Sequence, residues 1–265
     1  MRRKWLWLLS LLAMLALTGC ARQSEANSWP RIERSHTVVV GLDDSFVPMG
    51  FRQKNGQLAG YDIDLAKAVF KRYDVKVDFQ TIEWSMKETE LKNQTIDLIW
   101  NGYTETAARK QKVAFSDPYL TNHQVLVTKT KAGITSAQQM QGKTLGVQTG
   151  SSGADDLDQS PKVLKQYIAH QTPILYDTFN NALIDLDANR IQGLLMDEVY
   201  ARYYVAHEPD PKAYRLVTVD FPAETFAVGL RKSDTVLRQK INQALAALQK
   251  NGTTARLQKK WFGQN

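Results

Sequence analysis

A cluster of polar residues that could bind a carboxylate follows a short apolar run at 96–100. The cluster consists of Asn101, Gly102, Thr104 and Arg109. If 96–100 is a buried strand, these groups lie at its carboxyl end, where open α/β sheets bind small ligands. Arg109 lies one turn into a short helical pattern and offers a fixed fork of donors that fits a carboxylate. The same spacing also fits a strand, a turn and a surface arginine, so the rest of the chain must decide.

Polar groups also end two further apolar runs. The run 144–148 leads into a Thr-Gly-Ser-Ser turn that contains Ser151 and Ser152 and exposes N–H donors before a helix, an arrangement that favours anions. The turn is not a phosphate-binding P-loop, because the Gly-Lys-Ser/Thr ending is absent. Asp197 ends the run 191–196. The chain therefore places an arginine, N–H donors and an acid at the ends of separate strands.

The elements that must position these groups alternate along the chain. The expected strands are 37–42, 75–82, 96–100, 124–130, 144–148, 191–196, 214–219 and 225–230, and the expected helices are 62–73 with Asp62 as N-cap, 86–93, 136–140, 180–190, 237–248 and 253–261. The order strand, helix, strand predicts parallel sheets of the α/β class. The pattern restarts after Tyr119, which predicts two lobes of like architecture.

The first residues form a secretory signal pattern. A basic segment precedes an apolar stretch, 5–17, that is too short to span a bilayer comfortably. The only cysteine, Cys20, ends a Leu-Thr-Gly-Cys motif that resembles the bacterial lipobox, in which the thiol after the cleavage point carries a diacylglyceryl group. We expect a signal peptide over 1–19, a lipid on Cys20 and a flexible polar tether over 20–35. A buried free cysteine after an ordinary signal is the alternative.

Composition argues against several classes of function. The net charge of +7 falls to +4 once the three basic residues of 1–19 are removed, and the lysines form neither a basic stripe nor a known motif. We therefore expect no nucleic-acid partner. The four histidines lack metal-ligand spacing, and there is no Ser-His-Asp or Cys-His arrangement. We accordingly expect no metal, no cofactor and no catalytic residues.

Motifs from about residue 36 to 263 resemble the extracytoplasmic solute-binding proteins of family 3, which serve polar amino-acid ABC transporters. The matching segments, in family order, are 40–43 with Phe46, 60–66, 96–99, 104–109, 115–119, 146–151, and 251–253 with 259–263. One such motif would be weak, but the ordered set is specific.

The resemblance implies a two-lobe clamshell of the periplasmic-binding-protein type II class, in which each lobe is a mostly parallel sheet flanked by helices. The implied first lobe comprises 36–119 and 227–265, and the second comprises 124–221. A two-strand hinge, 120–123 and 222–226, would join them. Binding proteins of this kind close by hinge motion.

The resemblance also implies how the backbone groups of an amino acid would be held. Arg109 would pair with the α-carboxylate, and Gly102 and Thr104 would add backbone and hydroxyl contacts. The N–H groups of Ser151 and Ser152 would donate to the same carboxylate. Asp197 would accept the α-ammonium group, so that the two lobes together read a zwitterion.

The ligand side chain would be read by four residues, with two aromatic rings forming a sandwich. These residues are Asp43, Phe46, Trp84 and Gln148. The alternatives are that Phe46 and Trp84 are ordinary core aromatics and that Asp43 only caps its turn. We assign Asp62 and Asp117 to structure rather than to binding.

Departures from the family pattern leave the ligand side chain open. Asn101 stands where a small residue is common, and 48–51 and 192–193 differ from the usual motifs. Gln148 and Met196 replace the lysine and histidine of the glutamine binder, which weakens a glutamine assignment. A basic, amide or cystine-like side chain remains compatible.

The expected protein is therefore a bacterial receptor without enzymatic activity. We expect a monomer, anchored by lipid on the extracytoplasmic face of the cell membrane, that hands a polar L-amino acid to an ABC transporter permease. One alternative is a dehydratase on the same fold, with Glu83, Glu105 and Glu198 as candidate acids by position. Another is a stand-alone sensor domain, which the lack of a membrane or kinase segment after Asn265 disfavours.

Overall fold

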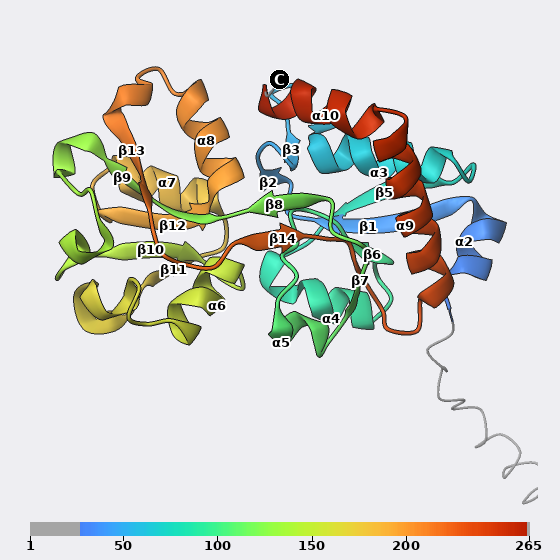
Figure 1. The fold of residues 1–265 in the computed structure, drawn as a ribbon, viewed down its shortest axis with the longest axis horizontal. Helices are drawn as coiled ribbons and strands as arrows, with labels where there is room; N and C mark the ends of the chain where they lie inside the picture. The colour runs from blue at the N-terminus through green and yellow to red at the C-terminus, as the bar shows by residue number, and fades with distance from the viewer. Residues whose placement is uncertain (1–26, 264–265) are drawn as a thin grey trace, which may run out of the picture.

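Two five-stranded sheets form the framework of the protein, whose computed structural model describes residues 27–263 (Figure 1). The first sheet has the order β5 (Lys76–Thr81), β1 (Thr37–Leu42), β6 (Leu98–Ile99), β15 (Gly229–Leu230) and β7 (Ala114–Phe115). The second has the order β11 (Ile174–Tyr176), β10 (Leu145–Gln148), β12 (Gly193–Asp197), β9 (Gln124–Lys129) and β13 (Tyr214–Thr218).

Each sheet is mostly parallel, as the alternation of strands and helices predicts. In the first sheet only β15 runs against its neighbours β6 and β7, and in the second only β9 runs against β12 and β13. The parallel strands are short apolar runs such as Thr37–Leu42, which suits strands covered on both faces. The two sheets therefore share one topology.

Helices cover both faces of each sheet (Figure 1). Over the first sheet, α3 (Tyr61–Lys71), α9 (Thr235–Lys250) and α10 (Thr253–Phe262) lie on one side, and α4 (Lys87–Lys92) and α5 (Ala107–Lys110) lie on the other. Over the second, α7 (Phe179–Asp187) and α8 (Glu198–His207) lie opposite α6 (Ser152–Gln159). Short 3-10 helices are η2 (Trp84–Met86), η3 (Thr130–Ala132), η4 (Ala137–Met140), η5 (Lys165–Tyr167), η6 (Ala169–Gln171) and η7 (Pro211–Ala213). Apolar side chains from both layers form the core of each lobe.

Two strands cross between the sheets. β8 (Leu120–Asn122) pairs antiparallel with β14 (Glu224–Phe226), and Figure 1 shows this pair in front of the gap between the lobes. The prediction of a single strand over 225–230 is wrong, because the chain leaves the crossing pair after Phe226 and joins the first sheet only at Gly229. We propose the lobe limits 36–119 with 227–265 and 124–221, with the crossing pair as hinge.

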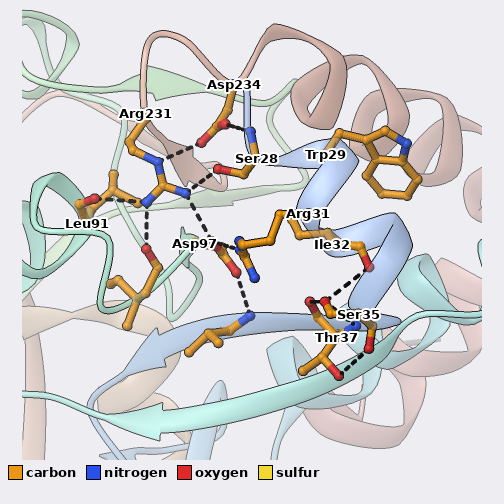
Figure 2. A network of polar contacts seen from close by, with 12 residues as sticks. Ser28, Trp29, Arg31, Ile32, Ser35, Thr37, Leu91, Asp97, Arg231 and Asp234 are labelled. Carbon is orange, nitrogen blue, oxygen red and sulfur yellow. Dashed lines mark hydrogen bonds and ion pairs between the residues drawn. The ribbon is translucent and has the colours of Figure 1, made fainter. Parts of the chain in front are cut away.

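The segment before the first sheet differs from the prediction. A flexible tether over 20–35 was expected, but α2 (Trp29–Ser35) is a helix with Trp29 and Ile32 buried. Figure 2 shows why: Arg231 Nη2 donates to Ser28 Oγ over 2.6 Å, and Ser28 N donates to Asp234 Oδ1 over 2.6 Å. Partners more than 200 residues away fix this segment, so local composition misleads. Cys20, the signal sequence and the rest of the tether lie outside the described residues.

Asp62 does not cap α3, contrary to the prediction. Gly60 is the N-cap residue, and Asp62 lies buried within the first turn. Its Oδ2 atom accepts hydrogen bonds from Gly102 N over 2.7 Å and from the Tyr119 hydroxyl over 2.9 Å. Burial raises the pKa of Asp62 to about 7. The residue thus has the structural role expected of it, as the support of the Gly102 turn.

A small antiparallel sheet extends the first lobe toward the second. It consists of β2 (Ser45–Phe46), β3 (Gly50–Arg52) and β4 (Leu58–Ala59), with a turn at Gly56 between the last two. Phe46 from this sheet reaches aromatic rings of the second lobe, with ring centroids 5.9 Å from Phe179 and 5.4 Å from Tyr200. The small sheet therefore carries one wall of the space between the lobes.

Candidate ligand-binding site

A cavity with an empty volume of about 280 Å³ lies between the two lobes. The structure brings together all eleven residues expected to contact a ligand, because each of them lines this one cavity. They are Asp43, Phe46, Trp84, Asn101, Gly102, Thr104, Arg109, Gln148, Ser151, Ser152 and Asp197. Its wall combines charged, polar and aromatic groups from both lobes, as sites for small polar ligands do.

Arg109 forms the cationic end of the cavity. The Thr106 hydroxyl caps the short helix α5 by accepting from Arg109 N over 3.2 Å, which fixes the backbone. The guanidinium donates to Thr104 O and to Gly150 O, each over 3.0 Å, and lies 4.8 Å from the centroid of the Tyr103 ring. A guanidinium has five N–H groups, so these bonds leave donors for a carboxylate.

The turn before α6 supplies the second set of polar groups. Ser151 caps the helix through its hydroxyl, which accepts from Ala154 N over 3.1 Å. Its own N–H, expected to donate to a ligand, donates to Gln148 O over 3.2 Å. Ser152 Oγ accepts from Thr104 Oγ1 over 3.1 Å. Thus the Ser152 side chain contacts Thr104, one of the residues expected to bind the ligand carboxylate, whereas Ser151 stabilises the turn.

Gly102 and Asn101 fix the loop below Arg109. The N–H of Gly102 is held by Asp62, so only its carbonyl is left for a ligand contact. Asn101 Oδ1 accepts from Asp43 N over 3.2 Å and so ties this loop to the loop after β1. The sequence departure at Asn101 therefore links two of the loops that line the cavity.

Asp197 forms an anionic end in the second lobe. It ends β12, is buried, and its Oδ1 accepts from Asn122 Nδ2 over 2.6 Å and from Gln124 Nε2 over 3.1 Å. Glu224 Oε2 accepts from the same two nitrogens, each over 2.9 Å. Burial, and then the charge of Glu224, raises the pKa of Asp197 well above its usual range.

Sequence reasoning missed Asn122, Gln124 and Glu224. All three are buried beside Asp197 on the crossing strands and the start of β9. One signal was present: Gln124 opens a strand that is otherwise apolar, where a polar side chain needs a partner. The partners themselves lie 73 and 100 residues further along the chain, so no local pattern could name them.

Asp43 forms a second anionic group, on the first lobe. Its Oδ1 accepts from Ser45 N over 2.9 Å and from the Ser45 hydroxyl over 2.6 Å, so it does stabilise its own turn. Its Oδ2 accepts from Gln148 Nε2 over 2.9 Å across the cleft. Burial raises the pKa of Asp43, and the hydrogen bonds from Ser45 oppose that shift.

Phe46 and Trp84 both line the cavity, and both are also packed into the apolar core. Phe46 packs on Phe179 and Tyr200, and Trp84 meets the Tyr103 ring edge-on at 5.9 Å. The core role given as the alternative is therefore present for both rings. Because both rings also line the cavity, a sandwich of the ligand side chain between them stays a proposal.

The two lobes touch each other around the cavity. Besides the bonds from Arg109 to Gly150 and from Gln148 to Asp43, Lys87 Nζ in the first lobe donates to Gly150 O over 2.9 Å. Lys87 is buried, and burial, followed by the charge of Arg109, lowers its pKa to about 8. Two cations thus converge on one carbonyl of the other lobe, so the structure is a closed form.

The acids considered for a dehydratase lie elsewhere. Within residues 27–263, neither Glu83, Glu105 nor Glu198 lines the cavity. Glu105 pairs with Lys110 over 2.9 Å, and Glu198 accepts from Arg202 Nε over 2.7 Å. In the same part of the chain no group of three or more His, Cys, Asp or Glu side chains is arranged to hold a metal, and no helix has the length and apolar character to cross a membrane.

Comparison with known proteins places this geometry in a family. Residues 38–264 match the bacterial extracellular solute-binding proteins, family 3, and the chain belongs to that family. The fold is accordingly the type II periplasmic-binding-protein clamshell.

Three relatives show the range of ligands within the family. A solved Streptococcus pneumoniae substrate-binding protein of an ABC uptake transporter, with bound histidine, is 50% identical, with a TM-score of 0.90 over 91% of this chain and 98% of that chain. An arginine-binding extracellular protein of Bacillus subtilis is 27% identical, covering 98% of both chains. An L-cystine-binding protein of Escherichia coli is 29% identical over 97% of this chain and 94% of its own.

Proposed function

We propose that this protein binds a basic L-amino acid outside the cell and delivers it to the permease of an ABC importer. One observation carries the proposal: the cavity between the lobes has a buried arginine at one end and two buried acids, Asp197 and Asp43, elsewhere in its wall. A zwitterion with an additional cationic group would complement this set of charges.

In this proposal each part of the ligand has its own partner. Arg109 holds the α-carboxylate with its free N–H groups, and Ser152 contributes beside it. Asp197 accepts the α-ammonium group. Asp43, whose Oδ2 is bridged to the second lobe by Gln148, accepts the side-chain cation, while Phe46 and Trp84 flank it. An aromatic wall beside a cation is favourable, which suits imidazolium and guanidinium groups.

The histidine bound to the 50% identical streptococcal protein supports L-histidine as the first ligand to test, and L-arginine as the second. Amide ligands and cystine stay in the test set because Gln148 can both donate and accept. L-Glutamate provides a control, since a second carboxylate would lie beside Asp43 and be repelled.

The proposed cellular setting follows from the first residues of the sequence. We propose cleavage before Cys20, lipid on its thiol, and a monomer that remains on the extracytoplasmic face of the bacterial membrane. Mass spectrometry of the mature protein tests this directly. A diacylglyceryl mass on residue 20 supports it, and a free N-terminus at another residue contradicts it.

A ligand screen tests the function. The protein without residues 1–26 is mixed with each common L-amino acid and with cystine, and thermal unfolding and titration calorimetry are recorded. We expect L-histidine or L-arginine to raise the melting temperature and L-glutamate to leave it unchanged, because ligands that bind only the folded state stabilise it. A set in which no amino acid shifts the melting temperature would contradict the proposal.

A further inference from the structure

Two buried carboxylates face the same pair of amide groups beside the cavity. Asn122 Nδ2 lies 2.6 Å from Asp197 Oδ1 and 2.9 Å from Glu224 Oε2, so the two oxygens are close neighbours around one nitrogen. Gln124 Nε2 repeats the arrangement, at 3.1 and 2.9 Å. The acids come from different elements, since Asp197 ends β12 and Glu224 begins β14 of the crossing pair.

The amide hydrogens are too few to satisfy both acids fully. Each amide NH₂ has two hydrogens. Gln124 Nε2 lies within hydrogen-bond distance of three acceptors, because Ser152 Oγ is also 3.2 Å away. In addition, Glu224 Oε1 is buried and has no hydrogen-bond partner among the described residues. Neutral donors therefore hold the two acids together without neutralising their charge.

The charges around the pair are mostly negative. From α6, Asp156 faces this region, and burial together with the charge of Glu224 raises the pKa of Asp156 to about 6. The neighbouring Asp155 pairs instead with Arg109, with 4.0 Å between Oδ2 and Nη2. From α5, Arg109 acts on Asp197, but its guanidinium bonds go to Thr104 O and Gly150 O.

The remaining charged groups next to the pair are already matched. At the start of α8, Glu198 pairs with Arg202, and beside β14, Glu105 pairs with Lys110. Among residues 27–263, neither Asp197 nor Glu224 has a salt bridge to a Lys or Arg side chain. Two buried like charges that share the same amide donors disfavour double ionisation.

We propose that Asp197 and Glu224 share one proton before the ligand binds and that the ligand α-ammonium group displaces it to solvent. Glu224 is then a positioning residue that links amino-acid binding to proton release. The ammonium keeps its own hydrogens and replaces the proton as the positive charge at Asp197, which lines the cavity beside Glu224. This inference rests on the proposed function, in which Asp197 holds the α-ammonium group.

Proton release makes affinity depend on pH. Protons compete with the ligand, so affinity falls as pH falls, by up to about tenfold per pH unit for one proton. Titration calorimetry of the protein with L-histidine and with L-arginine, in buffers of different ionisation enthalpy at pH 7, counts the protons released. We expect close to one proton released per L-arginine, whose guanidinium is charged both free and bound. L-Histidine should release fewer, because its imidazole takes up a proton at pH 7 when it binds Asp43 as a cation.

Glu224→Gln tests the assignment, because a glutamine cannot hold the exchangeable proton. We expect this variant to bind the ligand with less than half of the proton release and with a flatter dependence of affinity on pH between 6 and 8. The titration of the ligand itself is common to both proteins and cancels in the comparison. Glu224→Asp should restore the release, and Glu105→Gln, a control outside the cavity, should behave as the unchanged protein.

The free protein gives a readout that needs no ligand. A folded-state pKa above the unfolded value means that stability is highest at low pH and is lost as pH rises. Urea unfolding at pH 6, 7 and 8 should therefore show stability falling with pH, with a smaller fall in Glu224→Gln; the raised pKa of Asp62 contributes equally to both.

Ligand calorimetry and urea unfolding together distinguish a failure of the proposed function from a failure of the shared-proton proposal. If no amino acid binds but the pH slopes differ as expected, the proposed function fails while the shared proton stands. If ligand binds without proton release, or if Glu224→Gln releases as much as the unchanged protein, the inference is overturned and the function stands. Equal pH slopes in urea for the two proteins would also overturn it.

Discussion

Arg109 is a buried cation whose position is fixed by both lobes. One hydrogen bond goes to Thr104 O in its own lobe and one to Gly150 O in the other, while Tyr103 lies under the guanidinium plane. Each contact uses the planar shape of the group rather than its charge alone. We therefore expect the planar, multi-donor guanidinium to serve here better than a flexible ammonium group would.

Replacing Arg109 with alanine should weaken amino-acid binding by about 3–5 kcal/mol, since the buried ligand carboxylate would lose its charged partner. Arg109→Lys should recover only part of this loss. Titration calorimetry measures the change, and circular dichroism checks that the variants are folded. The control is Arg202→Ala on an exposed side chain, and affinity in Arg109→Ala within twofold of the unchanged protein would exclude the assigned role.

At the scale of elements, α2 is attached to the first lobe by one buried arginine. Arg231 donates to the Leu91 and Ile96 carbonyls over 2.9 and 2.7 Å, and it pairs with Asp97 and Asp234, each over 3.0 Å (Figure 2). Both acids are almost fully buried. A buried acid left without its cation is strongly destabilising.

We therefore expect Arg231→Met to lower the free energy of unfolding by about 3–5 kcal/mol. Arg31 provides a matched control, because it contacts the same Asp97 but its side chain is 50% exposed. Arg31→Met should lower the free energy of unfolding by less than about 1 kcal/mol. Urea unfolding compares the three proteins, and equal losses in the two variants would show that the buried network is not what holds α2.

Features of the structure that depend on local sequence were predicted, and features that depend on contacts between distant segments were not. Thr104 and Ser152 each follow closely after an apolar strand in the sequence, so both could be recognised as candidates before their contact was known. Asn122, Gln124 and Glu224 acquire their role only where β8 crosses β14, and α2 only where Ser28 meets Asp234. Such contacts depend on tertiary pairing, which periodicity does not encode. The break within 225–230 has the same cause.

At the scale of the whole molecule, the lobes are joined by contacts at Gly150. Its carbonyl accepts from Lys87 and Arg109 of the opposite lobe, and its φ of +71° is favourable only for glycine. A Cβ atom there would lie 3.3 Å from Ser85 Cα and 3.4 Å from Lys87 Nζ. The closed form therefore leaves little room for a side chain at this point.

Gly150→Ala should favour the open form and weaken ligand binding, because only the closed form brings the added Cβ against Ser85 and Lys87 of the other lobe. Gly133→Ala is the matched control, because Gly133 has a similar φ of +68° but no atom within 4 Å of an added Cβ. Small-angle X-ray scattering with and without ligand, together with calorimetry, measures closure and affinity. Equal affinities in the two variants would argue against closure at this contact.

The attachment of α2 also sets how far the molecule can move from a membrane. Seven residues lie between Cys20 and Ser28, and the eight Cα-to-Cα steps of that segment span at most about 29 Å when fully extended. If Cys20 carries the proposed lipid, Ser28 and the first lobe attached to it stay within that distance of the lipid-bearing residue. A receptor held in this way meets its permease by lateral diffusion rather than by search through the medium.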